Sequence, residues 1–99
     1  MEEEPSLDEI VEMHAIVHGR VQGVFFRATT QDYAREFGVK GTVKNLSDGT
    51  VEIYAQGKRE TLDRLISRLK SDAGPGYVES CSVEFYKPIT QYEDFSVGY

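Results

Sequence analysis

The chain has 99 residues, 39% of them hydrophobic, which suits one compact domain with one active site. No apolar run approaches the roughly 20 residues of a membrane span, and the acidic N-terminus lacks the pattern of a signal peptide, so we expect a cytoplasmic protein with no membrane partner. Cys81 is the only cysteine, which excludes an internal disulfide and, in its alternating apolar run, indicates a buried thiol rather than a nucleophile.

The net charge of −6 is unevenly distributed along the chain. Residues 1–12 hold six acids and no bases, so residues 13–99 hold 11 of each. We therefore expect an acidic extension over residues 1–12, disordered or with a short helix near the capping motif at residues 6–9, and a neutral folded domain over residues 13–99. Within residues 13–47 five bases stand against two acids, so this part can attract an anion.

Apolar periodicity predicts a strand over residues 13–18, followed by a glycine-bearing turn and a helix over residues 26–37 that ends at Gly38. Two further strands, residues 41–46 and 50–56, flank Asp48 and Gly49, a pair typical of a hairpin turn.

The rest of the chain predicts a second helix followed by two more strands. Leucine and isoleucine at helical spacing predict a second helix over residues 58–72, alternation predicts a strand over residues 78–86, and residues 95–99 can form a short last strand. The order βαββαβ is typical of the α+β class and of the ferredoxin-like, or split βαβ, arrangement. We expect a two-layer sandwich, with two helices on one face of an antiparallel sheet of four to five strands.

The turn after the first strand has the composition of an anion-binding site. Gly19 and Gly23 allow backbone angles at which successive N–H groups converge, and the helix that follows contributes its positive end. Arg27 adds a planar guanidinium that binds two oxygens at once. By itself the turn suits a nucleotide, a carboxylate or a sulfate, and it could equally be a simple connector.

Two motifs together resemble the acylphosphatase family. Residues 19–27, GRVQGVFFR, resemble the signature loop of that family, and residues 41–45, GTVKN, resemble its second block, which is followed by residues 49–51 and by Gln56 and Gly57. The resemblance extends from about residue 14 to residue 99, and two separated motifs in the right order are far more specific than one glycine motif. Thr42 stands where the family usually has tryptophan, which we expect to remove an aromatic surface beside the site.

The resemblance implies hydrolysis of acyl phosphates to a carboxylate and inorganic phosphate, by a monomer that needs no metal and no cofactor. It implies that Arg27 and a loop bind the phosphoryl group, that Asn45 positions the attacking water, and that Thr30 supports the loop. The loop residues so implied are Gly19, Arg20, Val21, Gln22, Gly23, Val24, Phe25 and Phe26.

Hydrolysis of an acyl phosphate needs few catalytic groups, which is consistent with the short set that the resemblance implies. A carboxylate leaves as an anion because its conjugate acid has a pKa of about 4.3, so no general acid is required. The asparagine amide cannot deprotonate water at neutral pH and suits an orienting role, while the proton passes to a phosphoryl oxygen. We assign His14 and His18 no task in this reaction.

Two other functions are open to this pattern. An acylphosphatase-like module also occurs within larger proteins that process carbamoyl phosphate, so a noncatalytic anion-binding domain is one alternative. The other is a single-stranded RNA binder, in which Tyr54 and Tyr86 would stack on bases. The strand over residues 50–56 lacks the basic-glycine-aromatic run of that module, and the neutral body attracts phosphates weakly, so we expect no nucleic-acid partner.

Overall fold

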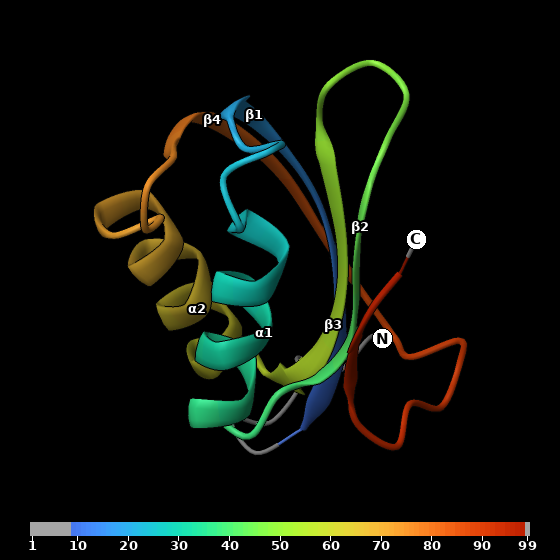
Figure 1. Cartoon of the computed structure of the whole chain (residues 1–99). Coiled ribbons are helices and arrows are strands. Elements are labelled where there is room, and N and C mark those ends of the chain that lie inside the picture. Colours follow the sequence, from blue (N-terminus) through green and yellow to red (C-terminus); the bar gives the residue numbers. More distant parts are fainter. Residues whose placement is uncertain (1–8, 99) are drawn as a thin grey trace.

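A computed structural model of the chain describes residues 9–98, which contain five strands and two helices (Figure 1). In chain order these are β1 (Ile10–Arg20), α1 (Phe26–Glu36), β2 (Lys40–Asn45), β3 (Val51–Lys58), α2 (Arg59–Ser71), β4 (Tyr77–Tyr86) and β5 (Phe95–Val97). The predicted βαββαβ order, the two helices and the ferredoxin-like α+β architecture are confirmed.

Within the described residues the strands form one sheet in the order β4-β1-β3-β2-β5. Figure 1 shows both helices on one face of this sheet, while the segment after β4 turns back and brings β5 beside β2. The four long strands pair antiparallel, but β5 pairs parallel with β2, so the sheet is mixed and not wholly antiparallel as predicted. The reason is geometric, because β4 runs opposite to β2 and a chain that reverses after β4 must run along β2.

The core lies between the sheet and the helices. The predicted alternation holds on β1 and β3, whose inward side chains are buried, and the predicted apolar face of α2 packs on them. The buried residues of these three elements are Met13, Ala15 and Val17, then Val51, Ile53 and Ala55, then Leu62, Leu65, Ile66 and Leu69.

The folded domain begins earlier than the sequence indicates. Ile10, Val11 and Glu12 belong to β1 and pair with β3, so the predicted extension over residues 1–12 is wrong for its last three residues. Residues 1–8, on which the prediction of disorder or a short helix falls, lie outside the described residues.

The buried carboxylate of Glu12 accounts for the difference between the predicted and the observed start of β1. It sits on the face of the sheet away from the helices, yet it is 1% exposed. The Gln56 amide donates to its Oε1 at 2.7 Å, and the Tyr86 hydroxyl donates to the same carboxylate. Gln56 also donates to the carbonyl of Thr90, so the segment between β4 and β5 covers this part of the sheet.

Candidate active site

The turn between β1 and α1 is shorter than the predicted loop. Gly19 and Arg20 are still part of β1 and pair with Val78 and Tyr77 of β4. A β-bulge lies between His18 and Gly19, where φ of Gly19 is +140° and an added Cβ would lie 2.4 Å from the carbonyl oxygen of Tyr77. Gly19 therefore permits the close approach of two strands.

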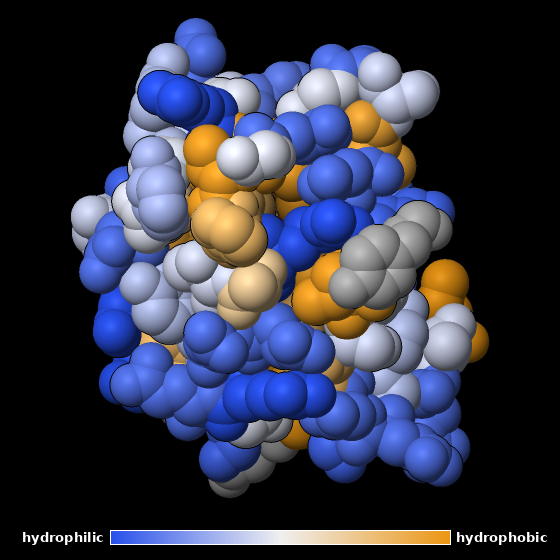
Figure 2. Space-filling view, viewed as in Figure 1, coloured by the Kyte–Doolittle hydropathy of each residue, from blue (hydrophilic) through white to orange (hydrophobic). Residues whose placement is uncertain are grey.

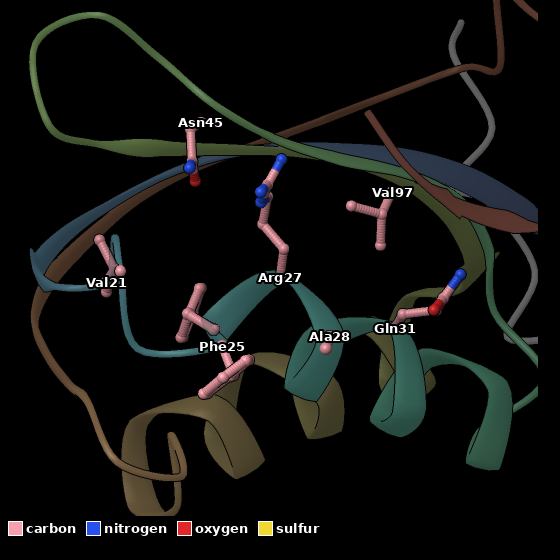
Figure 3. A pocket seen from close by; sticks show the side chains of 9 residues that line it. Val21, Phe25, Arg27, Ala28, Gln31, Asn45 and Val97 are labelled. Atoms are coloured by element: carbon pink, nitrogen blue, oxygen red, sulfur yellow. The ribbon is translucent and has the colours of Figure 1, made fainter. Parts of the chain in front are cut away.

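A cavity of about 620 Å³ lies between this turn, the start of α1, the end of β2 and β5 (Figure 3). Six of its lining residues were predicted as site residues: Val21, Gly23, Phe25, Phe26, Arg27 and Asn45. Three were not: Ala28, Gln31 and Val97. The helical periodicity places Ala28 and Gln31 on α1, but it does not show which face of the helix meets the last strand. No local pattern links Val97 to a turn more than 70 residues earlier.

Arg27 and Asn45 approach the cavity from different elements. Arg27 is half-buried in the first turn of α1, while Asn45 is the exposed last residue of β2. Figure 3 shows both side chains pointing into the space between the helix and the sheet. The two residues singled out by the sequence are thus brought to one site, although 18 positions separate them in the chain.

The segment that follows β5 holds the Arg27 guanidinium in place. Its Nη1 donates to the carbonyl oxygen of Gly98 at 2.7 Å. One turn further along the same helix face, the Gln31 amide donates to the carbonyl of Phe95 at 3.0 Å, and after another turn Arg35 pairs with Asp94 at 3.0 Å. Spacing of four residues along α1 therefore attaches the last strand beside the cavity.

Gln22 connects the two halves of the site. It does not line the cavity; its amide donates to the carbonyls of Leu46 and Thr50, both at 2.8 Å. These carbonyls flank the tip of the β2–β3 hairpin, directly after Asn45. The side chain predicted to bind phosphate thus joins the turn to the strand that carries Asn45.

The remaining predicted residues support the turn without lining the cavity. Val24 is buried in the core, and the fully buried Thr30 hydroxyl donates to the carbonyl of Phe26 at 2.9 Å. Arg20 projects from the end of β1 and is not part of the cavity wall.

The start of α1 is suited to an anion. Among the described residues, no side chain caps its N-terminus by a hydrogen bond, and its first turn holds no acid. The N–H groups of a first helical turn lack intrahelical acceptors and carry the positive end of the helix dipole. Arg27 lies in that same turn, so its guanidinium lines the cavity beside the positive end of the helix.

Other titratable groups stand apart from this cavity. His14 Nε2 bonds to Glu52 Oε2 at 2.9 Å and stacks on Tyr54 with ring centroids 4.5 Å apart, on the opposite face of the sheet. Cys81 is half-buried against the core, and burial raises the pKa of its thiol, which disfavours the nucleophilic thiolate. In residues 9–98 no three His, Cys, Asp or Glu side chains are grouped as metal ligands.

Comparison with known proteins identifies the family of the chain. The acylphosphatase family profile matches residues 13–97. The chain belongs to the acylphosphatase family. A curated acylphosphatase from Archaeoglobus fulgidus is 47% identical over 91 residues, which are 91% of this chain and 100% of that protein. One from Roseiflexus sp. is 39% identical over 89 residues, 90% of this chain and 96% of that protein.

The fold of a solved acylphosphatase agrees with this assignment. The crystal structure of acylphosphatase from Bacillus subtilis matches with a TM-score of 0.85 and 35% identity, over 90% of this chain and 99% of that one. In this acylphosphatase, no helix within the described residues is long and apolar enough to cross a membrane.

One expectation about the family pattern is wrong. Thr42, in place of the usual tryptophan, was expected to remove an aromatic surface beside the site. Side chains alternate along a strand, so Thr42 lies on the opposite face of β2 from the buried Val43 and from Asn45. It is absent from the cavity wall and pairs with Tyr54 and Ser96. Its replacement of tryptophan therefore changes the outer face of the sheet.

Proposed function

We propose that this acylphosphatase hydrolyses the carboxyl-phosphate bond at the cavity between α1 and β2. The N–H groups of the turn and the Arg27 guanidinium bind the phosphoryl oxygens, and Asn45 orients the attacking water. The observation that carries the proposal is the arrival of Arg27 and Asn45 at one cavity from two different elements.

The reaction needs electrostatic stabilisation more than acid-base chemistry. Phosphoryl transfer passes through a loose transition state whose charge is spread over three equatorial oxygens. Oriented N–H donors and a guanidinium stabilise this charge without reorganising during the reaction. The P–O bond to the acyl group breaks as the water oxygen bonds to phosphorus, and the carboxylate takes both electrons of the broken bond.

Asn45 orients the attacking water molecule. Its amide can accept a hydrogen bond from a water molecule and donate another, which fixes the direction of the oxygen lone pair. The amide does not take the proton, which passes to a phosphoryl oxygen. The products are a carboxylate and inorganic phosphate.

The bond to Gly98 gives the Arg27 guanidinium a defined orientation. Five N–H donors lie in one plane in this group, so a bond at Nη1 restricts the plane in which the others are presented. A preoriented fork loses less conformational freedom when it binds two phosphoryl oxygens.

We also propose that the protein works as a cytoplasmic monomer, without a metal ion or nucleic-acid partner. The Arg27 charge supplies the electrostatic role that a metal ion often has in phosphoryl transfer. The two tyrosines that an RNA binder would use to stack on bases have other partners. Tyr54 stacks on His14, and the Tyr86 hydroxyl bonds to Glu12. A noncatalytic module is not favoured, because the match spans 96% and 100% of the two curated acylphosphatases.

The test is hydrolysis of acetyl phosphate and benzoyl phosphate by the purified protein with a chelator present. We expect enzymatic release of phosphate that the chelator leaves unchanged and that Arg27→Ala abolishes. Activity that depends on added metal would overturn the proposed mechanism. Binding of phosphate without hydrolysis of either compound would favour the noncatalytic alternative.

A further inference from the structure

Phe25 has an unusual combination of backbone and side-chain features. It is the N-cap residue of α1, with φ 61° and ψ 21° in the left-handed region, and it is the one described residue other than glycine with positive φ. Its side chain is 80% exposed. A bulky residue is strongly disfavoured in this backbone region, so a phenylalanine there needs an explanation.

Burial does not supply this explanation. The neighbouring Phe26 is 1% exposed and fills the core, whereas the Phe25 ring gains little from contacts with the described chain. Glycine would adopt the same backbone angles without strain and would expose no apolar ring to water. Strained residues with exposed apolar side chains at a cavity point to a function in ligand binding.

The surroundings of Phe25 indicate what the ring contacts. It lines the same cavity as Arg27 and Asn45, together with the apolar side chains of Val21, Ala28 and Val97. Figure 2 shows apolar side chains gathered over the turn that precedes α1 and over the start of α1. The cavity thus combines the anion-binding group of Arg27 with apolar side chains around it.

The in-line geometry of phosphoryl transfer indicates on which side of the cavity the acyl group lies. The attacking and leaving oxygens lie on opposite sides of the phosphorus. Asn45 approaches from the sheet, and Phe25 lies on the turn on the other side of the cavity (Figure 3). With the water beside Asn45, the acyl group leaves on the side of the turn.

We infer that Phe25 contacts the acyl group of the substrate and favours acyl phosphates with aryl or other large apolar groups over acetyl phosphate. The inference rests on the proposed function. A ring contact of this kind changes kcat/KM by between about twofold and tenfold, which is the range for an aromatic pair. The methyl group of acetyl phosphate is too small to share this contact.

The test compares kcat/KM for benzoyl phosphate and acetyl phosphate in four proteins: the unaltered chain, Phe25→Gly, Phe25→Leu and Tyr77→Ala. Phe25→Gly removes the ring and suits the backbone angles, while Phe25→Leu keeps apolar bulk. Tyr77→Ala is the matched control, because Tyr77 is another exposed aromatic residue, 58% exposed, outside the cavity. Using the ratio of the two substrates within each variant cancels a general loss of activity.

We expect the benzoyl-to-acetyl ratio to fall about two- to tenfold in Phe25→Gly, to fall less in Phe25→Leu and to be unchanged in Tyr77→Ala. An unchanged ratio in Phe25→Gly would overturn the inference while leaving the proposed function intact. An equal fall in Tyr77→Ala would also overturn it. Hydrolysis of neither substrate by the unaltered chain would instead overturn the proposed function.

Discussion

The carbonyl oxygen of Gly98 accepts a hydrogen bond of 2.7 Å from the guanidinium of Arg27, 71 positions earlier in the chain. Gly98 is itself held by β2, since its N–H donates to the carbonyl of Val43 at 2.7 Å. The orientation of the principal cationic group of the cavity thus depends on the last strand being docked on the sheet.

Replacing Arg27 by lysine should abolish most of the activity although the charge is kept. An ammonium group cannot bind two phosphoryl oxygens in one plane, and the loss of one preorganised donor typically lowers turnover by about 100- to 1,000-fold. Steady-state kinetics with benzoyl phosphate measures this. Arg64→Lys, on the exposed surface of α2, is the matched control and should keep the activity of the unaltered protein. Near-normal turnover of Arg27→Lys would contradict the role given to Arg27.

Replacing Asn45 by alanine should separate turnover from phosphate binding. We expect kcat to fall by about 100-fold or more, because the water loses its orienting group, while competitive inhibition by inorganic phosphate is kept. The measurement is kcat together with the inhibition constant of phosphate. If phosphate binding disappears along with turnover, Asn45 has a structural role and not the one proposed.

Replacing Gln31 by alanine should weaken the docking of β5 and disturb Arg27 indirectly. The lost hydrogen bond to the buried Phe95 should lower the free energy of unfolding by about 1 kcal/mol. Urea unfolding measures this, and we expect a higher KM for acyl phosphate at the same time. Arg35→Ala, which breaks the exposed pair with Asp94, should change stability less than Gln31→Ala does, because solvent screens this pair. An unchanged free energy of unfolding in Gln31→Ala would show that β5 is docked without help from Gln31.

Stability should fall at alkaline pH through Tyr86. Burial, followed by the bond to Glu12, raises the pKa of the Tyr86 hydroxyl above its ordinary value of 10.0. The folded state therefore holds this proton more tightly than the unfolded chain, so the contribution to stability is present below pH 10 and is lost as the pH rises above it.

Melting temperatures of the unaltered protein and of Tyr86→Phe between pH 8 and about pH 12 test this. The variant should lose less stability over the alkaline part of this range, because it lacks the ionising hydroxyl. Tyr77→Phe, at an exposed position, should follow the unaltered protein. Parallel curves for Tyr86→Phe and the unaltered protein would show that Tyr86 does not contribute to the pH dependence.

Local patterns were enough to predict the helices and the long strands. The helical spacing of Leu62, Leu65, Ile66 and Leu69 and the alternation along β3 depend only on neighbours in sequence. Arg27 and Asn45 stood out because each ends a motif that resembles a signature of the acylphosphatase family. What these patterns leave undetermined is pairing between distant segments.

Most of the differences between prediction and structure arose from such pairing. The parallel register of β5, the contact of Arg27 with Gly98 and the place of Gln31 in the cavity depend on how the chain returns after β4. Glu12 belongs to a strand because Gln56 and Tyr86 satisfy its carboxylate, which its own neighbours do not reveal. The role of Gly19 likewise comes from the carbonyl of Tyr77 on the adjacent strand.

The Gln22 bridge also determines where the chain can accept insertions. Its two hydrogen bonds end on Leu46 and Thr50, and Leu46 N–H donates to the Thr50 carbonyl at 2.9 Å, so the base of the hairpin is closed at that point. Residues 47–49 lie beyond this closure, and lengthening an exposed tip adds little closure entropy. A peptide tag or fluorophore-binding loop can therefore be placed there while Asn45 keeps its position relative to the turn.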